Sequence, residues 1–199
     1  MQKYSVFSLI KNAFSNHMNW DVAWKDPTPK KEYDVIIIGG GGHGLATAYY
    51  LAKEHNITNV AIIEKGWIGG GNVGRNTTIV RSNFMYDANG RFNEFGMDLW
   101  RNLSQELNFN VMFSPRGIIN LAHSDAQMNA YARRGNSMRL NGIDAELLNR
   151  EQVKKLIPMA DFSDDVRFPI FGGLMQPSAG TARHDAVAWG YARQADSMG

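Results

Sequence analysis

The 199-residue sequence has no cysteine and very little net charge. Without cysteine the chain cannot form a disulfide or a thiolate metal site, and this absence suits a reducing cytoplasm. The 21 Lys and Arg side chains nearly balance the 19 Asp and Glu side chains, for a formal charge of +2. Because no basic block accompanies that charge, nothing in the sequence indicates nucleic-acid binding.

The first 32 residues lack the features of a membrane span or a normal signal peptide. Residues 4–14 follow a short amphipathic helical pattern, but its apolar stretch is too short for either of these. Two alternatives remain for this segment. It is a transit peptide, or it is an extension that packs Trp20 and Trp24 on the body of the protein.

The clearest pattern that is present lies between residues 33 and 65. Residues 34–38 contain an apolar, β-branched run typical of a strand that is buried on both faces. A glycine turn follows, then residues 45–54, which are rich in helix formers, and then a second apolar run at residues 60–63. The order of strand, turn, helix and strand predicts one βαβ unit.

The glycines of this turn fit the pattern G-x-G-x-x-G at Gly39, Gly41 and Gly44. Gly39 permits the sharp turn, Gly41 lets the backbone approach a pyrophosphate, and Gly44 lets the helix pack close to the sheet. The free N–H groups at the helix start would face the phosphates. Glu64 can accept hydrogen bonds from a ribose diol and would repel a 2′-phosphate, which disfavours NADP. The alternative, a glycine-rich turn in an ordinary α/β sheet, leaves Glu64 unexplained.

A second glycine cluster follows directly, in residues 66–82. Asn72, Arg75, Asn76, Thr77 and Thr78 lie within it or just behind it. Backbone N–H groups, hydroxyls and one arginine so close together would suit the far side of the same pyrophosphate. The alternative is a flexible surface loop. Because NAD dehydrogenases do not need a second cluster, the pattern favours a flavin.

Residues 84–165 predict a mostly helical segment on the substrate side or at an interface. Residues 89–108 have apolar side chains at helical spacing, and residues 113–123 predict a strand pair or a strand with a turn. Helices should begin at Ser124 and Asn149, each of which has glutamine three positions later, as in a capping box.

The last segment, residues 166–199, places a histidine at a helix end. Residues 168–175 predict a strand and residues 185–198 a helix, so that His184 lies at the helix N-terminus. The helix dipole and the neighbouring Arg183 disfavour the imidazolium form, and a neutral imidazole is a nucleophile. From these residues alone both roles stay open, a cap or surface residue and a point of cofactor attachment.

Together these patterns divide the chain into four segments. These are an extension (1–32), a dinucleotide-binding core (33–83), an inserted segment (84–165) and a return strand and helix (166–199). A doubly wound sheet needs further parallel strands, and Gly199 has the character of a helix C-cap. We therefore expect the N-terminal part of a longer protein.

Three stretches carry a family resemblance. They read PKKEYDVIIIGGGGHGLATAYYLAK, EKGWIGGGNVGRNTTIVRSN and QPSAGTARHDAVAWGYAR. The first is shared with many FAD proteins, whereas the other two are more specific. From about Trp20 to Gly199 the sequence resembles the β subunits of heterotetrameric sarcosine oxidases, in the glycine oxidase/D-amino-acid oxidase superfamily. The resemblance implies an α/β fold, a Rossmann-like FAD-binding domain of the glutathione-reductase type with an inserted α+β segment.

The resemblance also implies two flavins. FMN would be bound covalently through the histidine of TARHDAVAW, which is His184. No catalytic residue and no metal ligand is assigned. Non-covalent FAD would lie on the two glycine clusters and the acidic strand end, at Gly39, Gly41, Gly42, His43, Gly44, Glu64, Lys65, Asn72, Thr77, Thr78 and Ile79.

The implied reaction is oxidation of sarcosine to glycine, with dioxygen reduced to hydrogen peroxide and the one-carbon unit passed to tetrahydrofolate on the α subunit. The implied partners are the α, γ and δ subunits; nucleic acid and membrane are not among them. One alternative is a single-flavin amine or amino-acid oxidase or dehydrogenase of the glycine or dimethylglycine type. Another is a non-catalytic nucleotide-binding subunit. Because much of the substrate pocket would lie in a C-terminal half, we expect this stretch alone to be inactive.

Overall fold

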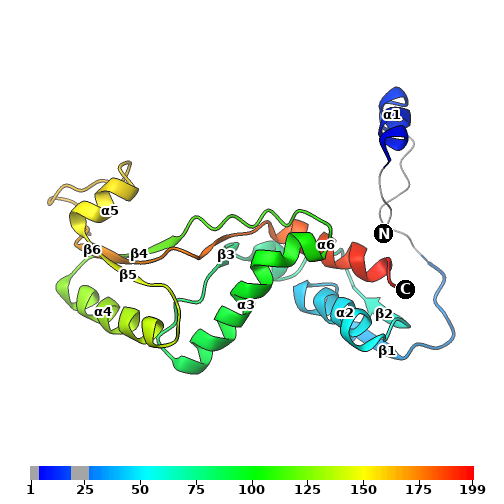
Figure 1. Ribbon diagram of the computed structural model, residues 1–199, viewed down its shortest axis with the longest axis horizontal. Coiled ribbons are helices and arrows are strands. Elements are labelled where there is room, and N and C mark those ends of the chain that lie inside the picture. The colour runs from blue at the N-terminus through cyan, green and yellow to red at the C-terminus, as the bar shows by residue number, and fades with distance from the viewer. Residues whose placement is uncertain (1–4, 19–26) are drawn as a thin grey trace.

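A computed structural model of the chain describes residues 5–18 and 27–199 (Figure 1). The expected packing of Trp20 and Trp24 falls outside these residues. The elements are, in order, α1 (Val6–Phe14), β1 (Val35–Ile38), α2 (Gly42–His55), β2 (Val60–Ile63), the 3₁₀ helix η1 (Val73–Arg75), β3 (Ile79–Val80), α3 (Asp87–Glu106), β4 (Ile118–Ala122), α4 (Asp125–Leu140), β5 (Glu146–Asn149), α5 (Arg150–Leu156), β6 (Gly172–Gln176), β7 (Gly180–Thr181) and α6 (His184–Asp196).

One end of the molecule holds the predicted βαβ unit. β1 and β2 pair in parallel, from Val35 opposite Val60 to Ile38 opposite Ile63. α2 begins at Gly42 rather than at residue 45, because the glycines after the turn already adopt helical geometry. α2 and α6 lie side by side (Figure 1), and their buried side chains join those of α3 in one apolar core. This core supports the turn between β1 and α2.

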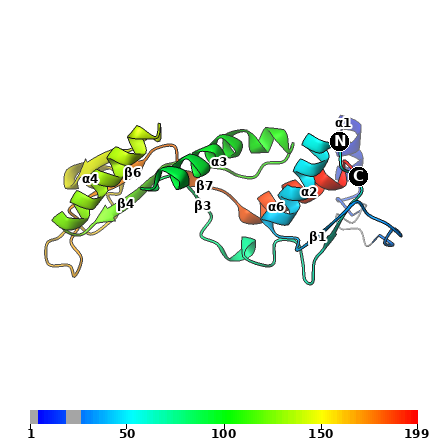
Figure 2. The ribbon, with the colours of Figure 1, turned by 90° about the horizontal axis from the view of Figure 1, so that it is seen from below.

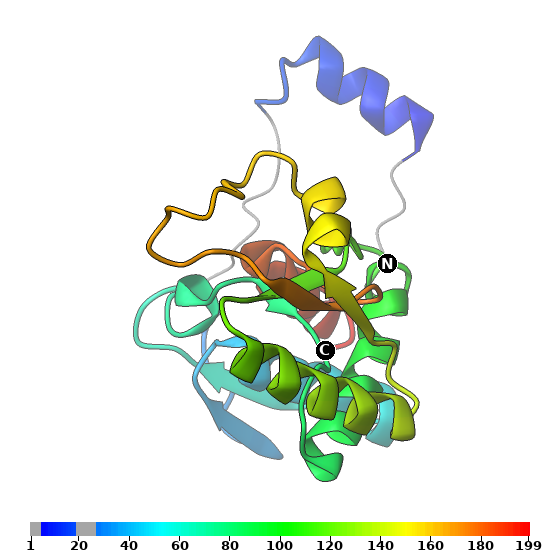
Figure 3. The ribbon, with the colours of Figure 1, turned by 90° about the vertical axis from the view of Figure 1, so that its left-hand side faces the viewer.

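The other end holds a three-stranded antiparallel sheet in the order β4-β6-β5. Leu174 of β6 packs with Met138 of α4, whereas Leu148 of β5 packs with Val153 of α5. α4 and α5 therefore cover opposite faces of the sheet (Figure 3). The predicted strand at residues 168–175 begins only at Gly172, because its partner β4 ends at Ala122, the residue opposite Gly172.

The long helix α3 and the short ladder of β3 with β7 connect the two ends (Figure 2). The ladder has two residue pairs, Ile79 with Thr181 and Val80 with Gly180. Ser114 adds a bridge to Thr181, so that residues 113–123 form one strand and a separate bridge rather than a strand pair.

Only one of the two expected capping boxes is complete. At Asn149 the side chain accepts from the Gln152 N–H, and Gln152 accepts from the Asn149 N–H in return. At Ser124 the hydroxyl accepts from the Gln127 N–H, but the Gln127 side chain accepts from the His123 N–H instead, at 2.6 Å. The capping-box pattern thus predicts both helix starts correctly. It is wrong about the bond from the Ser124 N–H to the Gln127 side chain.

α1 forms as expected within residues 4–14, and none of its side chains is buried. Within residues 5–18 and 27–199, no helix is long and apolar enough to cross a membrane.

Candidate functional site

The turn between β1 and α2 has the geometry that its glycines predict. Gly39 has a φ of 108°, a left-handed conformation that favours glycine. A Cβ on Gly44 would lie 2.1 Å from the carbonyl oxygen of Gly39, so only glycine allows the helix to start this close to the turn. The N-cap is Gly41, which brings no side-chain hydrogen bond to the helix start. The N–H groups of the first turn are therefore available to an anion.

Glu64 lies beside this turn at the end of β2. Its Oε2 accepts from the Gly40 N–H at 2.7 Å, and its Oε1 accepts from the Gly66 N–H at 2.9 Å. These two backbone bonds hold the pKa of the Glu64 carboxyl below its usual value. Each oxygen keeps a lone pair for a further donor. The exposed Lys65 follows directly.

The second glycine cluster lies against the first. The Gly69 N–H donates to the Gly40 carbonyl at 2.9 Å, and a Cβ on Gly42 would lie 3.1 Å from Cγ2 of Val73. Asn76 then accepts from the Thr78 N–H at 2.6 Å. The two clusters that are adjacent in the sequence are thus also adjacent in space.

A cavity of about 470 Å³ opens beside these turns. Its walls include several of the predicted binding residues, which are Gly42, His43, Asn72, Thr78, Ile79 and His184. The remaining predicted residues do not line it, namely Gly39, Gly41, Gly44, Glu64, Lys65 and Thr77. Asn76, which the second glycine cluster indicated, also lines the cavity. Sequence reasoning missed the other wall residues, which are Val73, Val80, Trp100, Ala182, Val187 and Tyr191. Val187 and Tyr191 follow His184 at helical spacing, which is the signal that could have identified them.

His184 is the first residue of α6 and part of the cavity wall. Its Nδ1 is buried and has no hydrogen-bond partner within the described part of the chain. Arg183 donates to Asp185 through Nε at 2.9 Å and through Nη2 at 2.6 Å. Because this ion pair offsets the arginine charge, Arg183 adds little net positive charge beside His184, in contrast to the expectation from sequence.

Tyr191 of the cavity wall packs with Tyr49 and Tyr50, which do not line the cavity. The ring of Tyr191 lies 5.6 Å from that of Tyr49 and 6.1 Å from that of Tyr50. Burial raises the pKa of Tyr191, and burial together with a bond to Glu106 raises the pKa of Tyr49 to about 12. Both phenols therefore stay neutral at physiological pH.

Comparisons with known proteins agree with this geometry. The sequence model of the FAD dependent oxidoreductases matches residues 34–199. Sarcosine oxidase subunit beta of Rhizobium meliloti is 62% identical over 197 residues, which cover 99% of this chain and 47% of that protein. The subunit of the same name from Rhodobacter capsulatus is 52% identical over 199 residues, or 100% of this chain and 48% of that protein.

Among solved structures, L-proline dehydrogenase from P. horikoshii matches with a TM-score of 0.76 and 27% identity, over 86% of this chain and 43% of that one. The chain spans about half the length of the curated relatives it matches. The identities confirm the resemblance to sarcosine oxidase β subunits, and the structural match confirms the α/β fold class expected from sequence.

Proposed function

Because the chain belongs to the family of FAD dependent oxidoreductases, we propose that it is the flavin-binding part of a sarcosine oxidase β subunit. The observation that carries the proposal is the cavity in which the glycine turn meets His184. Two relatives at 52% and 62% identity named sarcosine oxidase subunit beta support the choice of substrate and of a multi-subunit enzyme.

The first glycine turn fits the pyrophosphate of FAD. Uncapped N–H groups at a helix start bind phosphate, and the close approach at Gly44 keeps them next to the sheet edge. The ionised Glu64 would accept from the ribose. The residues that we propose to hold FAD are Gly39, Gly41, Gly42, His43, Gly44, Glu64, Lys65, Asn72, Thr77, Thr78 and Ile79.

His184 fits the covalent attachment of FMN. A buried polar atom without a partner is costly, and a bond from Nδ1 to a ligand in the cavity would remove that cost. The cavity volume of about 470 Å³ falls in the range of small-molecule sites, roughly 300–1,000 Å³. Trp100, Val187 and Tyr191 would exclude water from the attached group.

When bound, flavin supplies the two-electron redox chemistry that amino-acid side chains lack. The proposed reaction converts sarcosine to glycine, with dioxygen reduced to hydrogen peroxide and the one-carbon unit passed to tetrahydrofolate. The proposed partners are α, γ and δ subunits, and the proposed compartment is the cytoplasm.

Peptide mass spectrometry tests the attachment. The full-length chain, co-expressed with its partner subunits, is denatured and digested with trypsin, which releases residues 184–193. We expect an FMN-sized mass on His184, and we expect His184→Ala to lose this mass while the complex keeps its FAD. His123→Ala is the matched control, because the Nδ1 of His123 instead contacts the carbonyl oxygen of Phe168 at 3.1 Å.

Two results would overturn the proposal. An unmodified peptide from an active, flavin-loaded enzyme would instead support a single-flavin amine or amino-acid oxidase or dehydrogenase of the glycine or dimethylglycine type. A flavin-loaded complex that sarcosine cannot reduce would point to a non-catalytic nucleotide-binding subunit.

A further inference from the structure

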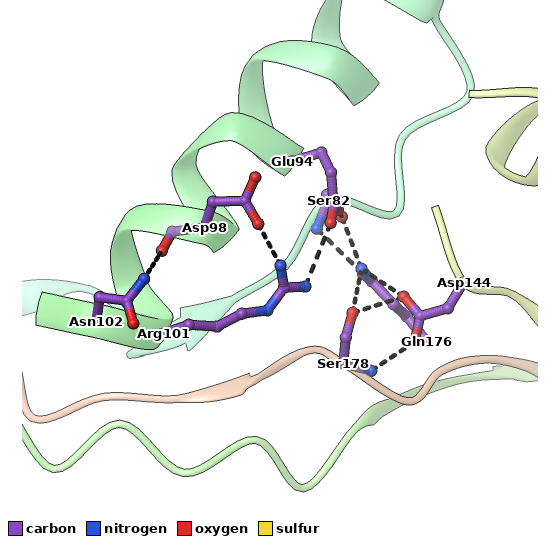
Figure 4. Close-up of polar contacts among 8 residues, drawn as sticks. All are labelled: Ser82, Glu94, Asp98, Arg101, Asn102, Asp144, Gln176 and Ser178. Atoms are coloured by element: carbon purple, nitrogen blue, oxygen red, sulfur yellow. Dashed lines mark hydrogen bonds and ion pairs between the residues drawn. The ribbon is translucent and has the colours of Figure 1, made fainter. Parts of the chain in front are cut away.

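A network of buried and half-buried polar side chains lies where the two ends of the molecule meet. Figure 4 shows Ser82, Gln176, Ser178 and Asp144 pointing toward one another, with Glu94 of α3 above Ser82. Ser82 follows β3, Gln176 ends β6, Ser178 lies in the turn before β7, and Asp144 precedes β5. The network thus joins segments that are far apart in the sequence.

The bonds of the network are short and reciprocal. The Ser82 N–H donates to Oε1 of Gln176 at 3.0 Å, and Nε2 of Gln176 donates back to Oγ of Ser82 at 2.6 Å. Asp144 accepts from both donors of Ser178, from N–H at 2.6 Å and from the hydroxyl at 2.5 Å. Ser82 also donates to Oε2 of Glu94 at 2.6 Å. Two bonds thus hold Ser82 to Gln176, and two more hold the turn after Gln176 to Asp144.

Burial makes these bonds important. Ser82 and Gln176 are 0% exposed, so water cannot replace a lost partner of either side chain. A buried donor or acceptor that loses its partner bears the full cost of desolvation. Asp144 and Ser178 are half-buried, and the two bonds between them extend the network outward from this buried pair.

The network is also directly connected to the cavity wall. The ladder of β3 with β7 has only two residue pairs, which is too short to fix its own position. Just beyond the ladder, the Ala182 N–H donates to the Thr78 carbonyl at 3.0 Å and the Arg183 N–H donates to the Val111 carbonyl at 3.1 Å. His184 comes next. Thr78, Ala182 and His184 all line the cavity.

We propose that Asp144 and Gln176 are positioning residues for the cavity. Asp144 fixes the turn between β6 and β7, Gln176 fixes the start of that turn to Ser82 at the end of β3, and together they set the position of His184. Neither residue lines the cavity, so each acts through the β3–β7 ladder. The consequence for flavin attachment rests on the proposed function, whereas the consequence for the ladder does not.

The test compares Asp144→Ala and Asp144→Asn with wild type in the full-length chain, co-expressed with its partners. Asparagine keeps the shape of the Asp144 side chain and one of its two acceptor oxygens, whereas alanine removes both oxygens. Asp164→Ala is the matched control, because the carboxylate of Asp164 pairs with Arg150 at 2.6 Å, away from the network. The first readout is hydrogen exchange of the amides of residues 178–184, and the second is the fraction of the 184–193 peptide that carries flavin.

We expect exchange at residues 178–184 to be about tenfold faster in Asp144→Ala, because loss of the network lets this unit open separately from the rest. Asp144→Asn should lie between Asp144→Ala and wild type, Asp164→Ala should match wild type, and β1 and β2 should be unchanged in all three variants. The flavin-bearing fraction at His184 should fall in the same order.

The outcomes separate the two proposals. Unchanged exchange at residues 178–184 in Asp144→Ala, or an equal loss of protection throughout the chain, overturns the positioning role. If Asp144→Ala does not fold, Asp144→Asn decides by the same criterion. A wild-type protein without flavin on His184 contradicts the proposed attachment, and the exchange result still decides whether the network positions the ladder.

Discussion

At the scale of single residues, Gly44 leaves no room for a side chain. Its missing Cβ is what lets α2 begin against the Gly39 carbonyl, where a methyl group would lie 2.1 Å from the oxygen. The backbone must shift if any side chain is placed there, and the N–H groups of the first helical turn shift with it. The proposed phosphate binding and the packing of the helix thus both depend on the absence of this Cβ atom.

We expect Gly44→Ala to lower FAD affinity by at least about tenfold and to cost roughly 1–3 kcal/mol in the free energy of unfolding, as overpacking does elsewhere. FAD retained after gel filtration and urea unfolding of the full-length chain measure the two effects. Gly71→Ala is the control, since a Cβ there meets nothing within 4 Å. Wild-type FAD retention in Gly44→Ala would contradict the role of this glycine.

At the scale of elements, the N-terminus of α6 combines a helix dipole with an ion pair. Asp185 lies in the first turn, where a carboxylate is favourable, and Arg183 at the N-cap donates to both of its oxygens. The bonds from Arg183 lower the pKa of Asp185 to about 2. Because the folded-state pKa lies below the ordinary value of 3.8, the ionised carboxylate stabilises the folded state above that value, and this stabilisation disappears as the pH falls toward 2.

We therefore expect Asp185→Asn to lower the free energy of unfolding by about 0.5 kcal/mol near neutral pH, a small effect because both side chains are half exposed. Urea unfolding of wild type and variant at a series of pH values measures the difference. The difference should shrink as the pH falls from about 4 toward 2. A difference that is the same at all pH values would show that ionisation of Asp185 is not its source.

At the scale of the whole molecule, one face of the parallel pair is bare. Ile36, Ile38 and Ile63 are exposed on β1 and β2, and Ile38 is 89% exposed. Parallel sheets are almost always covered on both faces. The chain spans 47% and 48% of the two curated relatives, so their remaining length is available to cover this face.

We expect residues 1–199, expressed alone, to bind a dye specific for exposed apolar surface and to produce no peroxide from sarcosine. Full-length protein in complex with its partners should bind less dye and should produce peroxide. A fluorescence titration and a coupled peroxide assay give the two readouts. Sarcosine-dependent peroxide from residues 1–199 alone would contradict the expectation.

Sequence by itself determined the features that depend on short spacings. The βαβ unit, the left-handed turn at Gly39, the close approach at Gly44 and the position of His184 at a helix start all follow from residues that are near neighbours in the chain. These features form locally, because the periodicity of apolar residues and the conformational freedom of glycine act within one or two turns of backbone.

Only the tertiary structure decided which distant residues meet. It placed Trp100 and Tyr191 in the cavity wall, paired Arg183 with Asp185 and joined Ser82 to Gln176 across 94 positions. It also brought the Gln127 side chain to the His123 N–H, whereas the capping-box pattern predicts a bond to the Ser124 N–H. Such contacts depend on how whole elements pack, and the packing is determined by the burial of many side chains together rather than by any local pattern.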